Sequence, residues 1–378
     1  MQRLAVGWVT WELTQSHSWL GLVAMADLFP TVFCSPVGGV IADRFDRRKL
    51  VLATQWASVA VTLCFYLVAV LDLLTPEALL GFVFVSGVIA GVDHPIRQSL
   101  IGDLVPPKDL GSAVALSAMT FNLARMIGPA LGGPLLIWFG LQGVLVANAA
   151  SYLVYIVCAM RFDLTGTPQR AVAPKASFLA DIGAGLAYVM QRRDLLFALS
   201  MLLLVSLLLR PVFELLPAFA ARLGTGLVGI RPEVVLSALT TTLGFGAFMG
   251  VLVAPIVSFR LGLRAGIWTS AIGSGLVIPV FLAVGQPLVV MALMGVFGCL
   301  LLINSVLVQM CVHQNSEPEY RGRSLSLQSM IFRAAPALGA LSIGWFAERV
   351  GLEAAFDVAV AVWAVLAVVL FFQLRKTR

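Results

Sequence analysis

The sequence predicts an all-α integral membrane protein with many spans, built from two similar halves of six helices each. Hydrophobic residues make up 60% of the 378 positions and charged residues only 12%, whereas soluble proteins carry about 25% charge. Apolar runs of about 20 residues, long enough to cross a ~30 Å hydrocarbon core, recur along the chain. The third observation is an internal sequence repeat. A soluble two-domain protein is excluded by this combination.

Polar breaks bound the apolar runs. After a short first segment, the expected spans are 18–41, 50–71, 77–101, 112–138, 141–161, 194–220, 233–258, 265–284, 287–312, 323–347 and 353–374. These runs are too long and too weakly alternating for membrane β-strands. The first segment, 1–14, covers only ~21 Å as a helix, so we expect it to be the second half of a first span whose beginning is missing. Twelve spans result, with the first incomplete.

The two halves are related by a shift of 211 positions, which aligns 105–141 with 316–352 without a gap. Ten of the 37 aligned pairs are identical: Pro107/Pro318, Gly111/Gly322, Leu116/Leu327, Met119/Met330, Phe121/Phe332, Ala124/Ala335, Gly128/Gly339, Gly133/Gly344, Gly140/Gly351 and Leu141/Leu352. The fifth span therefore repeats as the eleventh. Parallel halves of this kind are typical of transporters whose substrate site lies between them.

The predicted domains are a first six-helix bundle over 1–161, a cytoplasmic linker over 162–193 and a second six-helix bundle over 194–378. The linker begins with a polar, proline-containing stretch. Its second part carries Phe178, Ile182, Leu186 and Val189 on one helical face. That pattern fits an amphipathic helix on the inner membrane surface, and equally a connecting helix that packs on the bundle.

Lysine and arginine in the connections predict the orientation. If the first short loop faces out, the inward-facing connections hold 18 of these residues and the outward-facing ones only three: Arg222, Arg231 and Arg349. Both termini are then cytoplasmic, and the protein lies in the cell membrane. This placement explains the net charge of +6 without a nucleic-acid partner; the expected partners are the lipid bilayer, a small-molecule substrate and protons.

The most specific local pattern joins the second and third spans, from Gly39 to Lys49 (GVIADRFDRRK). It resembles the loop signature of the major facilitator superfamily, G-x-L-A-D-R-x-G-R-R, and the resemblance implies that superfamily's fold. Gly39 would let a neighbouring helix approach closely. Asp43 would act as a gate by pairing with arginines or a helix terminus in one state only. The alternative is that the basic residues only anchor the loop.

The remaining residues of this gating loop are Arg44, Arg47 and Arg48, with Asp103 as the expected acidic partner. One residue departs from the signature, because Asp46 stands where the superfamily has its second glycine. A Phe-Asp pair at this place is expected of the siderophore-exporter branch.

A second pattern lies on the fifth span, where Gly128, Pro129, Gly132 and Gly133 form a GPxxGG sequence. It resembles the antiporter motif of drug and proton exchangers in the same superfamily. Proline removes a helical hydrogen bond and permits a kink, and glycines allow close helix packing in lipid. The motif favours export over import; tight packing alone is the alternative.

The stretch that begins at Asp93 and runs to the GPxxGG motif resembles the enterobactin-exporter-like and multidrug-efflux branch of the superfamily. The resemblance covers nearly the whole chain, although members of the branch are usually longer at the N-terminus. It implies a proton-coupled exporter of an amphipathic small molecule, siderophore-like or drug-like, that works by alternating access. The alternatives are a nutrient importer of the same fold and a non-transporting membrane sensor or scaffold.

Charged residues inside predicted spans are functional candidates, because charge is costly in a bilayer. Arg125 and Arg333 are expected to face a central cavity from the two halves, and Asp93 is a candidate for proton coupling. Arg210 and Glu214, four positions apart beside a proline, either contribute to the cavity or neutralise each other.

The sequence contains no phosphate-binding loop, no HExxH, no paired-cysteine metal site and no nucleophile elbow. We therefore expect no catalytic residue, no metal and no cofactor, and the protein is not predicted to be an enzyme. The five cysteines lie in apolar segments without CxxC spacing, which is typical of packing residues.

The charge bias generates a topology prediction. Single cysteines introduced at Thr167 and Arg264 should be protected from membrane-impermeant thiol reagents in intact cells, whereas a cysteine at Gln142 should be labelled. Labelling of the Thr167 position from outside would overturn the orientation.

Overall fold

The computed structural model describes residues 1–161, 178–226 and 231–375, and these residues form helices without any strand. The helices are α1 (Gln2–Thr14), α2 (His17–Arg44), α3 (Arg47–Val70), α4 (Pro76–Leu104), α5 (Leu110–Met160), α6 (Phe178–Gln191), α7 (Arg193–Leu204), α8 (Pro211–Glu214), α9 (Leu216–Gly226), α10 (Pro232–Leu261), α11 (Leu263–Ala283), α12 (Pro287–Asn315), α13 (Pro318–Val350) and α14 (Leu352–Arg375). A 3₁₀ turn, Pro107–Asp109, precedes α5, and a π-helical turn, Val205–Leu209, follows α7.

Ten of the described helices are long and apolar enough to cross a membrane. The predicted span boundaries agree with them to within a few residues. α5 is continuous by its hydrogen bonds but contains a kink at Gly140, which is where the sequence predicts the end of the fifth span. The count of twelve requires dividing α5 at this kink and including α1, which has 13 residues. The predicted seventh span is broken into α7, the π turn, α8 and α9.

Two repeat-related glycines form turns with a similar backbone conformation. Gly140 has a φ of 63° and its repeat partner Gly351 a φ of 89°. Residues with a β-carbon rarely adopt this left-handed region, so glycine is the residue that permits both turns. The sequence repeat therefore corresponds to a repeated backbone conformation at the junctions of the fifth with the sixth span and the eleventh with the twelfth.

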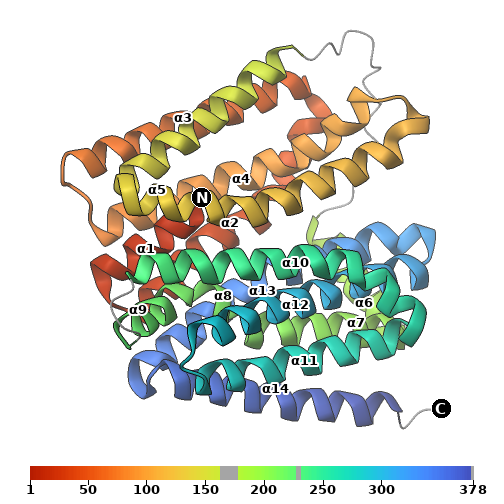
Figure 1. Ribbon diagram of the computed structural model, residues 1–378. Helices are drawn as coiled ribbons and strands as arrows, with labels where there is room; N and C mark the ends of the chain where they lie inside the picture. The colour runs from red at the N-terminus through yellow and green to blue at the C-terminus, as the bar shows by residue number, and fades with distance from the viewer. Residues whose placement is uncertain (162–177, 227–230, 376–378) are drawn as a thin grey trace.

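The helices form two groups (Figure 1): α2 to α5 lie in one, α7 to α14 in the other, and α1 lies between them. α2 packs on α13 and α5 packs on α10 across the boundary between the groups, which we call the seam. We call the end of the bundle that carries the turns near residues 45, 105, 192, 262 and 316 the basic end, and the other end the far end.

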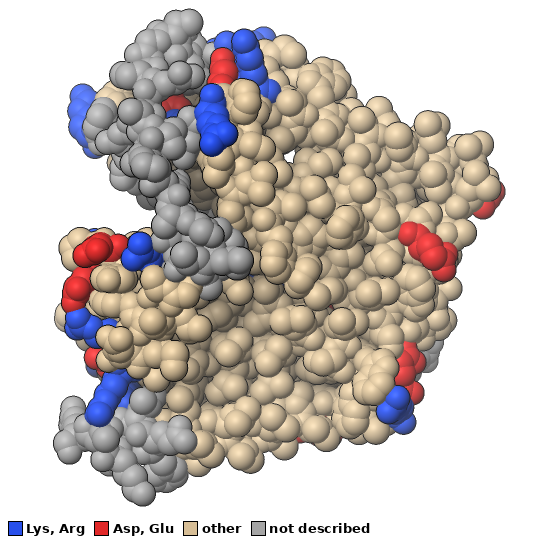
Figure 2. Space-filling view, turned by 180° about the vertical axis from the view of Figure 1, so that it is seen from behind, with Lys and Arg blue, Asp and Glu red and all other residues tan. Residues whose placement is uncertain are grey.

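Charged and uncharged residues occupy different regions of the surface. Figure 2 shows lysine and arginine gathered at the edge that holds the basic end, beside an uncharged belt that covers most of the face, and an indentation between the two groups at that edge. Many large apolar side chains on the long helices are exposed, among them Leu67, Trp138 and Val365. An exposed apolar belt over helices of this length is the surface that a lipid bilayer covers.

Glycines permit the closest packing in the second group. A β-carbon at Gly246 would lie 1.7 Å from the carbonyl oxygen of Gly295, and one at Gly250 would lie 2.4 Å from that of Cys299. Small residues at such interfaces let backbones approach, which stabilises helix pairs in lipid where no hydrophobic effect drives them together. α10 and α12 are accordingly in intimate contact.

The linker helix α6 packs on α13. Tyr188 stacks on Tyr320 with ring centroids 4.4 Å apart, and its hydroxyl accepts a hydrogen bond of 3.0 Å from the backbone N–H of Glu317. Val189 is buried, whereas Leu186 is half exposed. The side chains of Phe178 and Ile182 are not among those that the structure describes. These contacts favour the connecting-helix alternative. The division into two bundles and a linker remains a prediction.

The packing of α10 on α12 generates a stability prediction. Gly246→Ala should destabilise the protein by about 1–3 kcal/mol, because the added methyl group must push two backbones apart. Gly81→Ala is the matched control, since a β-carbon there meets no atom within 4 Å; it should be neutral or slightly stabilising. Thermal unfolding in detergent would measure both, and equal melting temperatures would contradict the packing argument.

Candidate functional site

The loop between α2 and α3 is ordered by the residue that departs from the superfamily signature. Asp46 caps α3: its Oδ1 accepts hydrogen bonds from the backbone N–H groups of Arg48, at 2.9 Å, and Lys49, at 3.3 Å. Aspartate is a favoured N-cap because it satisfies amides that have no helical partner. The aspartate thus has a local structural role in this chain, and it starts the helix that carries the basic residues.

The structure brings Arg47 and Asp103 together. Arg47 Nη1 lies 2.6 Å from Asp103 Oδ2, and Arg47 Nε donates to the carbonyl oxygen of Ala42 at 3.2 Å. One guanidinium therefore ties the start of α3 to the ends of α2 and α4. Arg48 donates to the carbonyl of Met160 at the end of α5. This cluster fastens the basic ends of four helices of the first group.

Two residues of the predicted gate are not joined to this cluster by the described contacts. Arg44 is exposed at the last turn of α2. The side chain of Asp43 lies outside the described residues, so its gating role remains a prediction.

In this structure the close approach expected at Gly39 is made by its neighbour, Gly38. A β-carbon at Gly39 would meet no atom within 4 Å, whereas one at its neighbour Gly38 would lie 2.5 Å from the carbonyl oxygen of Val92 on α4. Adjacent helical residues point about 100° apart, so only one of the two can face α4. Gly38 provides the close approach of α2 to α4.

The GPxxGG sequence lies where α5 meets α1 and α10. A β-carbon at Gly132 would lie 3.0 Å from Met1 Cα, and one at Gly133 would lie 1.8 Å from Ser237 Oγ. Ser237 Oγ also donates to the carbonyl oxygen of Pro129 at 3.3 Å. Gly128 is the least tightly packed of the three, with the Met1 nitrogen 3.4 Å from its β-carbon position. The motif therefore makes a close helix contact at the seam, as the packing alternative expects.

The break in the seventh span places two charged side chains beside the seam. The π turn widens the backbone just before Pro211, and Arg210 Nη1 donates to the carbonyl oxygen of Phe332 at 3.0 Å. Its guanidinium also lies 3.9 Å from the centroid of the Phe332 ring. π turns often occur at functional sites, and this one holds Arg210 against α13 and directs Glu214 toward α1.

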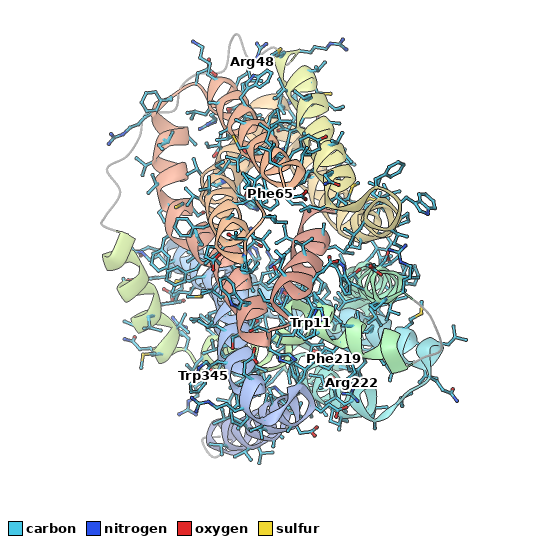
Figure 3. All side chains as sticks on the ribbon, turned by 90° about the vertical axis from the view of Figure 1, so that its left-hand side faces the viewer. Trp11, Arg48, Phe65, Phe219, Arg222 and Trp345 are labelled. Carbon is cyan, nitrogen blue, oxygen red and sulfur yellow. The ribbon has the colours of Figure 1, made fainter. Side chains whose placement is uncertain are left out.

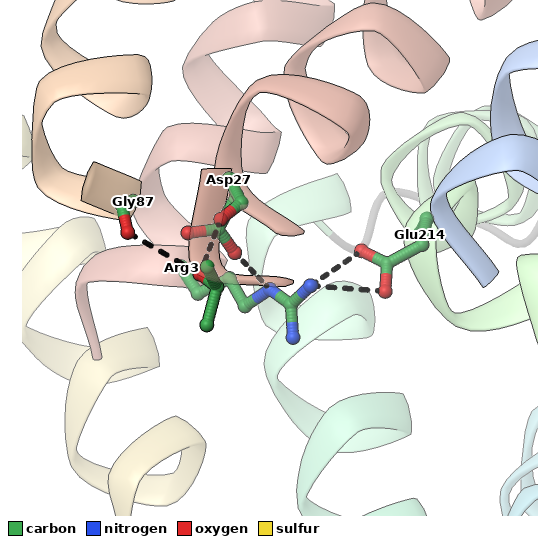
Figure 4. Close-up of polar contacts among 5 residues, drawn as sticks. Arg3, Asp27, Gly87 and Glu214 are labelled. Carbon is green, nitrogen blue, oxygen red and sulfur yellow. Dashed lines mark hydrogen bonds and ion pairs between the residues drawn. The ribbon is translucent and has the colours of Figure 1, made fainter. Parts of the chain in front are cut away.

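An ion network crosses the seam at Arg3 (Figure 4). Arg3 Nε lies 3.1 Å from Asp27 Oδ2 on α2, and Arg3 Nη2 lies 3.1 Å and 3.3 Å from the two carboxylate oxygens of Glu214. The Glu214 side chain is 11% exposed. Sequence reasoning placed Arg3 within a span but assigned it no role, and it missed Asp27. The signal was present, since both are charges inside predicted spans.

A second polar contact crosses the seam between α4 and α13. Arg333 Nη2 lies 2.9 Å from His94 Nε2. Because a guanidinium only donates, the histidine nitrogen is the acceptor and is unprotonated in this arrangement. His94 is thus a hydrogen-bonded helix residue here. The side chain of Arg125, the expected counterpart of Arg333, lies outside the described residues.

Asp93 faces the interior of the first group rather than the seam. Its Oδ1 accepts from Thr54 Oγ1 at 2.6 Å and from Gln55 Nε2 at 3.0 Å, and its Oδ2 lies 3.0 Å from Arg97 Nε. The sequence grouped Asp93 with the cavity residues. A one-residue step along α4 separates it from His94, which does reach the seam.

At the far end, Glu348 of α13 binds the start of α2. Its Oε1 accepts from Ser16 Oγ at 2.5 Å and from the backbone N–H of Ser18 at 3.1 Å. A carboxylate at a helix N-terminus is stabilised by the unpaired amides and the helix dipole. A β-carbon at Gly344, one turn away, would lie 2.4 Å from the carbonyl oxygen of His17. The seam is therefore tightly closed here.

A cavity of 670 Å³ opens beside this contact. It is lined by residues of both groups, including Trp11 and His17 from the first segments and Arg222 and Glu353 from the second group. Figure 3 shows the bundle from the far end, with Trp11 and Arg222 projecting near the boundary between the groups. Within the described part of the chain, no cluster of three histidine, cysteine or acidic side chains could hold a metal ion.

Comparison with known proteins agrees with this architecture. The profile of a family described as "Transmembrane secretion effector" matches residues 1–378. The multidrug efflux pump Tap of Mycobacterium tuberculosis is 24% identical over 377 residues, which cover 93% of this chain and 84% of Tap. The staphyloferrin A transporter of Staphylococcus aureus is 25% identical over 178 residues, or 45% of this chain. The chain aligns with only part of two of these relatives: 43% of the staphyloferrin A transporter and 59% of the uncharacterized MFS-type transporter YkuC of Bacillus subtilis.

The fold is that of solved transporters of the major facilitator superfamily. A bacterial homologue of the lysosomal transporter Spinster, in an inward-facing and unoccupied conformation, superposes with a TM-score of 0.75. The superposition covers 100% of this chain and 94% of the homologue at 15% sequence identity. An identity this low establishes the fold alone.

The contact at the far end generates a conformational prediction. Glu348→Gln should shift the population toward a state that is open at this end by about five- to thirtyfold, because it removes a charge-assisted acceptor worth about 1–2 kcal/mol. Distances between spin labels at Glu12 and Ala354 would report the opening.

Glu353→Gln is the matched control. Glu353 pairs with Arg222 inside the second group and does not cross the seam. Identical distance distributions for both variants would show that the Ser16–Glu348 contact does not hold the far end closed.

Proposed function

Because the chain belongs to the transmembrane secretion effector family of the major facilitator superfamily, we propose that it exports an amphipathic small molecule in exchange for protons. The export direction is supported by the family description and by the relative named as an efflux pump. The GPxxGG sequence at the seam supports it as well. Transport proceeds by alternating access, in which the two groups of helices rock about the substrate.

The substrate class is drug-like or siderophore-like. Two relatives carry these substrates in their names: Tap, aligned over 93% of the chain, as a multidrug pump, and the S. aureus protein, aligned over 45%, as a staphyloferrin A transporter. Arg125 and Arg333 add positive charge to the proposed central cavity, which suits an anionic or hydroxyl-rich molecule.

The observation that carries the coupling proposal is the Arg3 network. Asp27 lies on a helix of the first group and Glu214 on a helix of the second, and one guanidinium binds both. Protonation of either carboxylate removes one ion pair across the seam. A carboxylate that binds a proton in one state and an arginine in the other couples proton movement to the rocking of the groups.

The orientation follows from the charge bias. If the basic end faces the cytoplasm, this structure, closed at the far end, is an inward-open state. Its closed end is held by the contact of Glu348 with α2 and by the glycine contacts there. The opposite state must break these contacts and close the basic end, where the predicted gate residue Asp43 lies.

Glu214→Gln tests the coupling. In proteoliposomes, the rate of substrate transport driven by a pH gradient should fall at least tenfold in the variant, because the residue can no longer exchange a proton. It should retain substrate exchange without a gradient, since exchange needs no net proton movement. A fluorescent anionic dye or a metal-free siderophore serves as the test substrate.

Glu77→Gln is the control, because Glu77 is exposed at the first turn of α4, away from the seam. If Glu214→Gln kept the wild-type rate under the gradient, the Arg3 network would not be the coupling site. Uptake into right-side-out vesicles under an outside-acid gradient, with no efflux, would support the importer instead.

Asp43→Asn tests the gate. Removing its charge should shift the population toward the inward-open state by about five- to 150-fold, through loss of about 1–3 kcal/mol of stabilisation of the closed basic end. Membrane abundance and substrate binding from the cytoplasmic side should be retained while export falls strongly. Arg47→Ala should show a similar but milder defect. Wild-type export by Asp43→Asn would leave this loop as an anchor only.

A further inference from the structure

A cavity of about 220 Å³ lies inside the first group of helices, away from the seam. Its polar lining comes from Gln55, Ser58 and Thr62 on α3 and from Ser86, Asp93 and Arg97 on α4, with Tyr152 of α5 completing the wall. We propose that this cavity is a binding site for a compact, uncharged, hydroxyl-bearing molecule. This inference goes beyond the proposed export function and assigns a second site.

The charges of the cavity already balance. Asp93 Oδ2 lies 3.0 Å from Arg97 Nε, and the Arg97 guanidinium also lies 4.1 Å from the centroid of the Tyr155 ring. The carboxylate and the guanidinium neutralise each other. A charged ligand would leave an uncompensated charge beside the largely buried side chains of Asp93 and Gln55, which is costly. The lining therefore selects an uncharged ligand.

Two buried polar atoms at this cavity have no hydrogen bond among the described residues: the acceptor Gln55 Oε1, and the donor Arg97 Nε, which lies 3.0 Å from Asp93 Oδ2. Asp93 Oδ1 is occupied by Thr54 Oγ1 and Gln55 Nε2. Gln55 is only 2% exposed, and its Oε1 has no hydrogen-bond partner among the described residues. Ser58 Oγ donates a hydrogen bond to the carbonyl oxygen of Thr54, at 2.9 Å, so Ser58 Oγ can still accept a hydrogen bond.

A buried amide oxygen without a donor costs about 1–3 kcal/mol, so the site favours a ligand that supplies donors. A hydroxyl group donates to Gln55 Oε1 and to Ser58, and it can also accept from Tyr152 or Thr62. The volume corresponds to about seven water molecules, which is below the size of a drug-sized site. A short polyol matches both the size and the hydrogen-bonding pattern.

Equilibrium binding to the full chain in lipid nanodiscs, measured by saturation-transfer NMR titration, tests the site. The probes share a four-carbon skeleton: erythritol, its carboxylate erythronate, and the analogue with a terminal ammonium group. Erythritol should bind at least tenfold more tightly than either ion. Failure of all three probes to bind, or equal affinities, would overturn the proposal. No proton gradient is needed, so this result is independent of the exporter proposal.

Two substitutions locate the binding. Gln55→Leu should weaken erythritol binding by about tenfold, the effect of one hydrogen bond. Gln98→Leu is the matched control on α4, because Gln98 is exposed and does not line the cavity. Equal weakening by both variants would place the polyol elsewhere.

Charge variants give a readout that survives a poorly folding Gln55→Leu. Asp93→Asn leaves Arg97 unbalanced, so the preference should change from erythritol to erythronate. Arg97→Gln leaves the carboxylate unbalanced and should favour the ammonium analogue. If neither variant changes the order of affinities, the charge-balance argument for this cavity is wrong.

Discussion

The rest of the structure depends on how closely α2 approaches α13 at the far end. A β-carbon at Gly21 would lie 2.5 Å from the carbonyl oxygen of Ala340, and the same closeness recurs between Gly344 and His17. Helices in lipid are held by packing and polar contacts, because lipid is as apolar as their side chains. Backbone contact at this end holds the two groups together in the observed state. The side-chain contacts that cross the seam are made in this arrangement.

The polar contacts of the seam depend on this close approach. Glu348 reaches the N-terminus of α2 because the glycines beside it bring α13 within hydrogen-bonding distance. Nearer the middle of the spans, Arg3 and Arg333 each contact a residue of the other group. Ionisable groups are costly in a bilayer unless they are paired. The state of the seam therefore determines which of these groups have partners, and the proposed proton coupling rests on this dependence.

The sequence predicted the elements that depend on local composition. Span boundaries follow from hydropathy, and the matching turns at Gly140 and Gly351 follow from the repeat. The structure also places Asp103 beside Arg47, since both residues lie at the basic ends of neighbouring helices. The Arg3 network was not predicted, because its three members come from helices whose contacts exist only after the two groups assemble. Gly38 was not predicted, because the resemblance to the loop signature selects Gly39 by its place in the motif and does not show which of two adjacent glycines faces the neighbouring helix.

The architecture contains two kinds of polar contact, and the proposed rocking of the two helix groups affects them differently. Contacts that cross the seam, such as Glu214 with Arg3, must break or exchange partners when the far end opens. The Asp93–Arg97 pair and Gln55 lie on helices of one group and move together with them, so their mutual distances stay constant. A ligand in that cavity would consequently be bound in both states, and it could shift the equilibrium only through differential affinity. α4 connects the cavity to the seam and could give rise to such a difference in affinity. Asp93 lines the cavity, and the next residue, His94, contacts Arg333 across the seam.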